Sequence, residues 1–375
     1  MTTFNPDKPF DNLPLLPPAA DIETKSILKK TTAAARALSE LKSVSASIPN
    51  PLLLVGSIPL LEAKVSSEIE NIVTTSDDLF QFAADEHADA LPATKEAYRY
   101  SVALKGGFAA LNARPLSVAT ATLICQTLRG AEIQVRKMPG TIIADPSTRK
   151  AIYTPPSDPE RLKALLRNWE QYVNEPGGAD HLIKMAVMHY QFEAIHPFTD
   201  GNGRTGRILN ILYLVQHGLL ALPVLYLSRY ILENRQAYYR HIRAVTERGA
   251  WEPWILYMLD AIEVTATWTS RRILAVQELL DHTREHLKAI LPGIYTHELL
   301  ELMFSQPYIR IGNLIDSGIA ARDTASSYLR KLAAAGVLAE RKKGRTKLFQ
   351  HTKLLNLLLA REHTFEKYSQ HQSKQ

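Results

Sequence analysis

HPFTDGNGRTGR, residues 196–207, is the stretch that decides the fold. It holds Gly201, Gly203 and Gly206 just before an apolar helical run, ILNILYLVQHGLL (208–220). A glycine-rich turn that leads into a helix presents several backbone N–H groups and the positive end of the helix dipole to one point. The sequence therefore predicts an anion-binding turn at the start of a helix.

The polar side chains of this stretch complete a phosphate site. Asn202 adds an amide donor, and Arg204 and Arg207 lie on one face of the first helical turn, where guanidinium forks can grip phosphates. Asp200 is a hard oxygen ligand where a phosphate-bridging Mg2+ would lie. His196 takes up a proton near neutral pH. Taken singly, most of these residues fit a cap, a turn or a solvated face. Together they indicate phosphate-transfer chemistry without the lysine of a P-loop.

The stretch resembles the motif of the Fic (filamentation induced by cAMP) family, H-x-F-x-[DE]-G-N-G-R-x-x-R. Every fixed position matches, at His196, Phe198, Asp200, Gly201, Asn202, Gly203, Arg204 and Arg207. Members of the family typically transfer AMP from ATP to a hydroxyl side chain of a target protein. The related Doc branch carries Ala and Lys at the second and third loop positions and phosphorylates its target, so the glycines here point to AMP transfer.

The resemblance also implies roles for individual residues. His196 would deprotonate the hydroxyl of a target Ser, Thr or Tyr, Asp200 would hold Mg2+, and Phe198 would anchor the loop in the core. The ATP phosphates would be bound by Gly201, Asn202, Gly203, Arg204, Thr205, Gly206 and Arg207. A hairpin before the motif would form a flap over the nucleotide and align the target. Its tip would be Gly140, Thr141, Ile142 and Ile143, and Tyr238 would line the adenine pocket.

A second motif lies upstream, in KVSSEIENIV, residues 64–73. Its spacing predicts an amphipathic helix with Leu61, Val65, Ile69 and Ile72 turned inward, which by itself favours a solvated Glu70. However, Ser66-x-x-x-Glu70-Asn71 resembles the [ST]-x-x-x-E-[GN] inhibitory motif of Fic proteins that carry their own inhibitor on an N-terminal helix. That resemblance implies that Glu70 pairs with Arg207 and takes the place of the γ-phosphate.

The pattern along the chain predicts a mainly α fold, and together with the resemblance to the Fic family it implies five segments. They are an extended arm (1–18), a helical N-terminal region with the inhibitory helix (19–129), a helical Fic core with a β-hairpin flap and the catalytic loop (130–270), a connecting helix (271–290) and a winged-helix module (291–375). The winged helix is predicted from three helices, a turn at Ser317-Gly318 and two short strands across KKGR. In the core, Asp180 is expected to cap the helix before the motif, and His189 to be a hydrogen-bonded structural histidine.

The winged-helix module leaves two uses open. Arg322, Arg330 and Lys331 on the predicted recognition helix, and five basic residues in RKKGRTK (341–347), suit DNA. The rest of that helix is mostly Ala, Ser and Tyr, which favours docking or dimerisation instead. We expect a self-inhibited protein adenylyltransferase. The alternatives are a nucleotide-sensing, DNA-binding regulator and an enzyme that removes AMP. The histidine base favours an enzyme, because sensing ATP needs no base.

The composition of the whole chain agrees with an enzyme of several domains. Its 375 residues are 46% hydrophobic, and the net charge of +6 suits phosphate ligands or nucleic acid. The sole cysteine, Cys125, cannot form an internal disulfide, and no apolar run approaches the ~20 residues of a membrane span. The sequence therefore predicts a cytoplasmic protein without a membrane segment. Its expected partners are ATP and a hydroxyl-bearing target protein, with self-modification and a homodimer left open.

Overall fold

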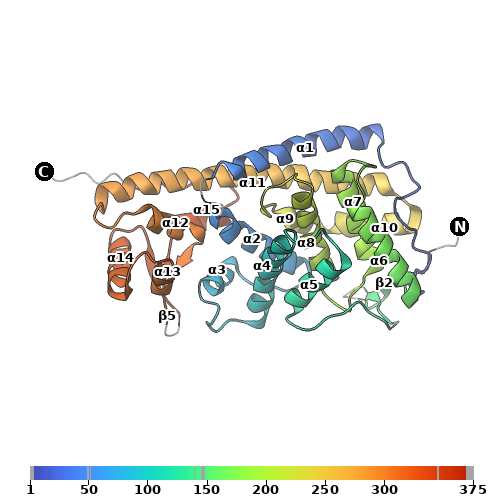
Figure 1. Ribbon diagram of the computed structural model, residues 1–375, viewed down its shortest axis with the longest axis horizontal. Coiled ribbons are helices and arrows are strands. Elements are labelled where there is room, and N and C mark those ends of the chain that lie inside the picture. Colours follow the sequence, from blue (N-terminus) through green and yellow to red (C-terminus); the bar gives the residue numbers. More distant parts are fainter. Residues whose placement is uncertain are drawn as a thin grey trace.

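The computed structural model of the chain describes residues 4–48, 50, 52–138, 140–144, 148–343 and 346–368. Helices make up most of it, which confirms the predicted mainly α fold. Figure 1 shows α1 (Lys25–Ala46) and α11 (Trp251–Ile290) side by side along the long axis. Lys30 of α1 forms ion pairs with Asp260 and Glu263 of α11. Helices of the central region and of the C-terminal region both pack against α11, so it joins the two regions.

The centre of the molecule is α7 (His181–Ile195), an apolar helix that is buried on nearly all sides. As predicted, Asp180 caps its start: the side chain accepts a hydrogen bond from the N–H of Leu182. Both α6 (Pro159–Asn174) and α8 (Asn202–Gln216) pack against α7. The surrounding helices are α4 (Pro92–Ala110), α5 (Val118–Arg129), α9 (Leu227–Glu233) and α10 (Arg235–Arg248).

The predicted inhibitory helix is α2 (Leu52–Ile69), and α3 (Ser76–Ala84) follows it. The helix ends one residue before Glu70, which lies in the closing turn. Asn71 adopts a left-handed conformation there, with φ of 62°. Asparagine takes this conformation at helix ends more readily than other residues with a side chain, which explains its place beside Glu70. The predicted inward face is buried at Leu61, Val65 and Ile69 and half-buried at Ile72.

A hairpin precedes the motif as predicted, formed by β1 (Ile143–Ala144) and β2 (Ala151–Tyr153). The hydroxyl of Tyr153 donates a hydrogen bond to the C=O of Ala194, and the N–H of Arg136 donates to the C=O of Pro197. Both ends of the hairpin are therefore tied to the chain around the end of α7. The predicted turn residues Pro139, Asp145 and Pro146 lie outside the described residues.

The N-terminal arm lies on the central helices, and residues 4–24 contain neither helix nor strand. Leu13 is fully buried. Arg161 of α6 donates hydrogen bonds to the C=O groups of Asp11 and Leu13, and Gln191 of α7 donates to that of Pro14. The carbonyl groups of the arm thus hold it against α6 and α7.

The C-terminal region contains the three helices and two strands predicted for a winged helix, in that order, together with an additional short strand and a final helix. In chain order it contains α12 (His297–Ser305), β3 (Tyr308–Ile309), α13 (Ile311–Asp316), α14 (Arg322–Ala334), β4 (Ala339–Lys343), β5 (Thr346–Gln350) and α15 (Thr352–Leu359). The strands are antiparallel in the order β3-β5-β4. Gly344 and Arg345 of the predicted wing lie outside the described residues, and the predicted connecting helix (271–290) is the second half of α11. In the described part of the chain, no helix combines the length and apolarity that a bilayer crossing requires.

Candidate nucleotide site at the start of α8

The loop between α7 and α8 bends through two residues in the left-handed region. His196 has φ of 49° and follows the last residue of α7, and Gly201 has φ of 85° and caps the start of α8. A side chain at position 201 would be strained at this φ, and its Cβ would lie 3.3 Å from Sγ of Cys125. The predicted glycine turn is therefore present, and Gly201 is the glycine whose backbone conformation requires it.

Asn202 and Arg136 hold the shape of this loop. Asn202 is buried; its Oδ1 accepts a hydrogen bond from the N–H of Phe198 (2.9 Å), and its Nδ2 donates to the C=O of Phe198 (2.8 Å). Arg136 donates to the C=O groups of His196 (2.8 Å) and Ile195 (3.0 Å). Phe198 is fully buried, in keeping with its predicted role as an anchor. The side-chain amide of Asn202 thus faces the loop itself, and the backbone N–H of Asn202 is the group left for a ligand.

The first turn of α8 offers backbone donors to an anion. The N–H of Thr205 donates to the C=O of Gly201 (3.0 Å), which closes the first turn. The N–H groups of Asn202, Gly203 and Arg204 precede this bond and have no acceptor within the helix. Together with the positive end of the helix dipole, they attract a negative group.

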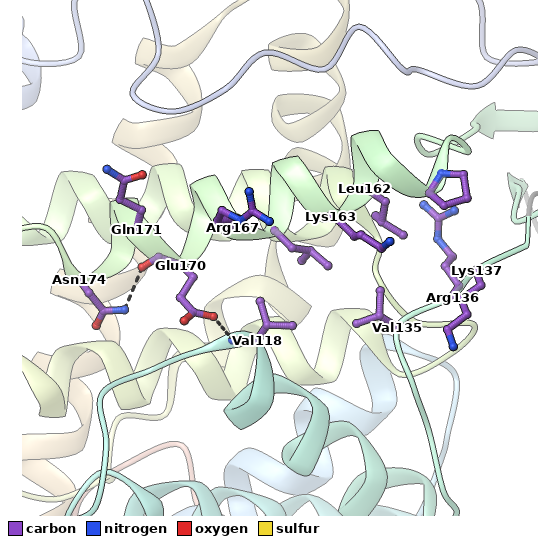
Figure 2. A pocket seen from close by; sticks show the side chains of 12 residues that line it. Val118, Val135, Arg136, Lys137, Leu162, Lys163, Arg167, Glu170, Gln171 and Asn174 are labelled. Carbon is purple, nitrogen blue, oxygen red and sulfur yellow. Dashed lines mark hydrogen bonds between the residues drawn. The ribbon is translucent and has the colours of Figure 1, made fainter.

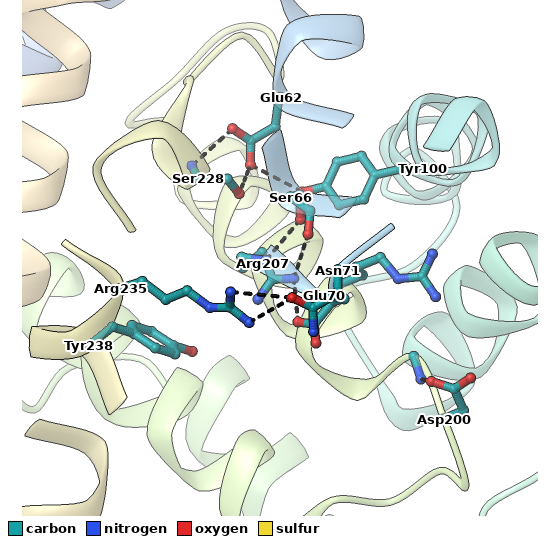
Figure 3. A network of polar contacts seen from close by, with 12 residues as sticks. Glu62, Ser66, Glu70, Asn71, Tyr100, Asp200, Arg207, Ser228, Arg235 and Tyr238 are labelled. Carbon is teal, nitrogen blue, oxygen red and sulfur yellow. Dashed lines mark hydrogen bonds and ion pairs between the residues drawn. The ribbon is translucent and has the colours of Figure 1, made fainter. Parts of the chain in front are cut away.

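A carboxylate already lies at this turn. A Cβ built on Gly203 would be 2.4 Å from Oε1 of Glu70, so the two residues are in direct contact. Oε1 of Glu70 also accepts a 2.7 Å hydrogen bond from Nη2 of Arg207. Arg207 donates further to the hydroxyl (2.8 Å) and the C=O (2.9 Å) of Ser66. Figure 3 shows Arg207 among these acceptors, and the predicted pairing of Glu70 with Arg207 is present.

Both arginines of the motif are buried, in different surroundings. Nη2 of Arg204 donates to Glu96 of α4 (2.9 Å), whereas its Nε and Nη1 have no hydrogen-bond partner among the described residues. A buried guanidinium donor without a partner is costly, and a phosphate oxygen would satisfy it. Arg204 thus keeps two buried donors without a partner, whereas Arg207 is already engaged by Glu70.

The side chain of His196 is half-buried beside the turn. Its Nδ1 is buried and has no partner within the described part of the chain. Burial, reinforced by the positive charge of Arg136, lowers the pKa of His196 to about 4. The imidazole is therefore neutral at pH 7 and free to accept a proton.

Asp200 is exposed, with 58% of its side chain accessible. It accepts a hydrogen bond from the N–H of Gly201 (2.6 Å) and pairs with Arg129 of α5 (2.8 Å). No group of three or more His, Cys, Asp or Glu that could hold a metal ion is found among the described residues. A Mg2+ ion that bridges phosphates takes one or two carboxylates from the protein and its other ligands from phosphate and water, so a single exposed carboxylate fits it.

Tyr238, predicted to line the adenine pocket, is buried in an aromatic cluster. Its ring packs against those of Trp254 and Tyr257, and its hydroxyl forms a 2.8 Å hydrogen bond with Nε2 of His189. His189 therefore has the structural role predicted for it. The neighbouring Tyr239 keeps 44% of its surface exposed and is the more accessible ring of α10.

The predicted flap tip is partly exposed. Gly140 has φ of 112°, a conformation that residues with a side chain rarely adopt. Ile142 is 55% exposed, whereas Thr141 and Ile143 are half-buried. An exposed apolar side chain on a hairpin rooted near His196 is available to cover a ligand.

Several side chains around the site were not predicted. Glu193 is one: a Cβ on Gly206 would lie 2.7 Å from its Oε1, so it packs against the start of α8. Burial raises the pKa of Glu193 to about 7. The signal that could have revealed it is a carboxylate in an otherwise apolar helix, three residues before His196. The others are Glu62, Glu96, Arg129 and Arg136, which gave no sequence signal of their own.

A groove of about 650 Å³ lies between α6 and the segment before the hairpin. Figure 2 shows its apolar floor at Val118, Val135 and Leu162, with Lys137 and Arg167 at its rim. None of the predicted ATP-binding residues lines it. The groove is therefore separate from the donors that mark the candidate nucleotide site.

Three family models match the chain in order. The Fic/DOC family N-terminal model matches residues 28–109, the Fic/DOC family model matches residues 120–214, and the model for the C-terminal domain of SoFic-like protein adenylyltransferase matches residues 279–354. The second match contains the whole loop with its glycine turn, and the third contains most of the C-terminal region.

Curated relatives are similar over part of the chain. A protein adenylyltransferase Fic of Aedes aegypti is 32% identical over 112 residues, 29% of this chain and 21% of that protein. One of Drosophila grimshawi is 28% identical over 169 residues, 44% of this chain and 33% of that protein. A probable protein adenylyltransferase of Aquifex aeolicus is 38% identical over 87 residues, 23% of this chain and 27% of that protein. The similarity thus spans about a third or less of these relatives.

Two solved structures share the fold. A Fic family protein from Desulfovibrio desulfuricans G20 aligns with a TM-score of 0.55 at 16% identity, over 88% of this chain and 96% of that one. A Fic domain containing signalling protein from Bacteroides thetaiotaomicron aligns with a TM-score of 0.53 at 17% identity, over 64% of this chain and 96% of that one. The likeness to these structures concerns the fold, and the three family models with the intact loop motif lead to one conclusion: the chain belongs to the Fic/DOC family.

Proposed function

We propose that the protein is an adenylyltransferase that transfers AMP from ATP to a hydroxyl side chain of a target protein, or of itself. The observation that carries this proposal is a neutral His196 beside a helix start that attracts anions. The named relatives support the reaction class, since they are adenylyltransferases.

In the proposed reaction, the hydroxyl oxygen of the target attacks the α-phosphorus of ATP. A bond forms between that oxygen and the α-phosphorus, the bond from the α-phosphorus to the oxygen that bridges to the β-phosphorus breaks, and pyrophosphate leaves. His196 takes the hydroxyl proton as general base, which its low pKa allows at neutral pH. The backbone N–H groups at the start of α8 and the free donors of Arg204 bind phosphate oxygens.

Asp200 is the residue that would hold Mg2+ in this proposal. The ion would neutralise charge on the phosphates when it is bound. Asp200 now pairs with Arg129 (2.8 Å), and Gly201 donates to it, so its carboxylate is held next to the turn before any ion arrives. Tyr238 would contribute to the adenine pocket from behind the accessible ring of Tyr239.

The proposal includes self-inhibition by Glu70. Its carboxylate contacts Gly203 and pairs with Arg207, so it competes with the γ-phosphate for the same donors. In the resting protein, ATP would therefore bind weakly or in an unproductive pose. Ser66 supports this state because two of its oxygens accept hydrogen bonds from Arg207.

The experiment that tests the proposal is incubation of the purified protein with α-labelled ATP and MgCl2, alone and with cell lysate. Mass spectrometry of labelled proteins would identify the acceptor side chain and its mass increase by AMP. If the protein incorporates label from γ-labelled ATP instead, the reaction is phosphorylation and not AMP transfer. Release of AMP from an already modified protein would point to the reverse, hydrolytic role.

A DNA-binding regulator is the second candidate, favoured by one observation. Arg322, Arg330 and Lys331 of α14 are all exposed, so the predicted recognition helix presents its basic residues to solvent. A salt-dependent complex with duplex DNA in an electrophoretic shift, without AMP transfer under any condition, would support this candidate. We infer a cytoplasmic location for either function, on the ground of the sequence.

A further inference from the structure

The segment that carries Glu70 is held by the C-terminal region on both sides. Upstream of Glu70, α2 packs against α12; downstream, α3 packs against β3. Figure 1 shows α3 close to the C-terminal helices and strands, which form the end of the molecule away from the N-terminus. The turn at the candidate site therefore lies between two contacts with a region about 230 residues later in the chain.

The upstream contact depends on Gly56 of α2. A Cβ at this position would lie 2.0 Å from the backbone oxygen of Ser305, at the end of α12. No side chain fits there unless the two helices move apart. Nδ2 of Asn50 also donates a 2.9 Å hydrogen bond to Glu301 of α12. The start of α2 is thus fixed to α12 by direct backbone contact.

The downstream contact is made by polar side chains. The hydroxyl of Tyr308 in β3 donates a hydrogen bond to Asp77 of α3 and accepts one from Gln350 of β5 (2.8 Å). Arg310 pairs with Asp85 at 3.1 Å, and the side chain of Asp85 is only 8% exposed. Charge-assisted hydrogen bonds that are shielded from water are the stronger kind. The two ends of α3 are thus tied to the C-terminal region, the start through Asp77 and the end through Asp85.

Between these contacts, one acidic face of α2 is attached to the central helices. Glu62, Ser66 and Glu70 follow one another at intervals of four residues, so Glu62 and Ser66 lie along one side of the helix and Glu70 follows in the closing turn. Glu62 is buried and accepts hydrogen bonds from the N–H of Ser228 (2.9 Å) and from the hydroxyl of Tyr100 (3.2 Å), as Figure 3 shows. The acidic face and the C-terminal contacts together define where Glu70 lies.

We propose that Tyr308 and Arg310 are positioning residues that keep Glu70 on Arg207, which makes the C-terminal region a regulator of AMP transfer. The proposal rests on the proposed function, in which Glu70 inhibits. Glu70 has to leave Arg207 before phosphates bind there, and movement of the turn between α2 and α3 would carry it away. Each contact that holds Glu70 on Arg207 lowers the population of molecules in which Glu70 has left Arg207. Displacement of β3 from α3 would therefore raise the rate of AMP transfer.

The test uses Arg310→Ala and Tyr308→Phe in the full-length protein. Tyr308→Phe keeps the buried ring and removes only the hydroxyl. We expect each variant to raise AMP transfer about fivefold, which corresponds to about 1 kcal/mol of lost net hydrogen bonding. In a Glu70→Gly background neither should change the rate, because the restraint is already gone. Lys331→Ala, exposed on α14 in the same region, is the matched control and should have no effect in either background.

The rate of backbone hydrogen exchange over residues 64–76 gives a second readout that needs no catalysis. It should rise in Arg310→Ala and stay unchanged in Lys331→Ala. Unchanged transfer in folded Arg310→Ala and Tyr308→Phe proteins would overturn the proposal, as would an equal rise in the Glu70→Gly background. Failure of the proposed function looks different, since Glu70→Gly itself would then transfer no AMP, whatever Tyr308 and Arg310 do.

Discussion

Oε1 of Glu70 lies 2.7 Å from Nη2 of Arg207, although 137 positions separate the two residues. The contact brings the end of α2 onto the first turn of α8, where Glu70 also touches Gly203. The start of that helix attracts anions, and a carboxylate of the protein already satisfies it. In the proposed function, ATP phosphates and Glu70 would therefore compete for one set of donors.

Glu70→Gly should raise AMP transfer about tenfold or more, because it removes a charge-assisted hydrogen bond from the donors that phosphate needs. The measurement is incorporation of label from α-labelled ATP. Glu68→Gly is the matched control: Glu68 lies near the same helix end and pairs with Lys64, so the rate should stay unchanged.

Arg207→Ala tests the other side of this pair. It should lower transfer both in the wild-type protein and in the Glu70→Gly background, because the phosphate loses its donor in each. A Glu70→Gly protein that is folded and binds ATP, yet transfers no more AMP than wild type, would contradict self-inhibition and leave Glu70 as a structural partner of Arg207.

The pH dependence of transfer should reflect the lowered pKa of His196. Burial and the charge of Arg136 lower this pKa to about 4, so the histidine is neutral, and active as a base, at every pH above that value. The kcat/KM of Glu70→Gly should therefore stay level from pH 8 to about 5.5 and fall only toward pH 4. ATP binding measured at each pH corrects for titration of the nucleotide. A fall centred near pH 6.5 would mean that His196 keeps its ordinary pKa.

The free energy of unfolding should also depend on pH, over a related pH range. Burial lowers the pKa of His189 and of His351 to about 3, from the ordinary histidine value of 6.5. Both take up a proton more readily when unfolded, so the stability they contribute is full above about pH 6.5 and is lost as the pH falls below it. The pKa of His196 is lowered in the same direction. The pH profile of AMP transfer should therefore be interpreted only at pH values at which the protein remains folded.

Much of the architecture around the site follows from local sequence, whereas the contacts between side chains of distant segments do not. The cap at Asp180, the apolar helix α7 and the glycine turn at Gly201 are set by residues within a few positions of one another, so their pattern predicts them. The pairing of α1 with α11 joins segments that are far apart in the chain, which no local pattern encodes.

The polar partners show the same limit. The sequence predicts Asn202 as a donor to the ligand. In the structure its side-chain amide forms hydrogen bonds with the backbone of Phe198, because buried main-chain groups in the loop need partners. The sequence suggests a free carboxylate at Asp200, yet this carboxylate pairs with Arg129 of α5. The pairing of Glu70 with Arg207 was predictable only through a resemblance, since helical periodicity favours a solvated glutamate.

Arg136→Lys should lower AMP transfer about tenfold or more while leaving the protein folded. Arg136 donates to the C=O groups of His196, Ile195 and Pro156, and a lysine cannot reproduce this fork. A displaced loop misplaces the base, and errors of about 1 Å cost up to a hundredfold in rate. Steady-state kinetics should show the loss in kcat. An unchanged kcat would mean that the loop holds its shape without this arginine.

Lys331→Ala combined with Lys342→Ala should leave AMP transfer unchanged. Both side chains are exposed, Lys331 on α14 and Lys342 on β4. If the region binds DNA, the same variant should weaken a salt-dependent shift of duplex DNA. No shift of the wild-type protein at low salt would dispose of the DNA-binding regulator.

The most direct test of the proposed function compares Glu70→Gly with Glu70→Gly/His196→Ala in α-labelled ATP and MgCl2. We expect the first protein to incorporate label with release of one pyrophosphate per AMP. The second should bind ATP with similar affinity and incorporate label about a hundredfold more slowly or worse, because it lacks the base. Equal rates in the two proteins, or label without pyrophosphate, would contradict AMP transfer with His196 as its base.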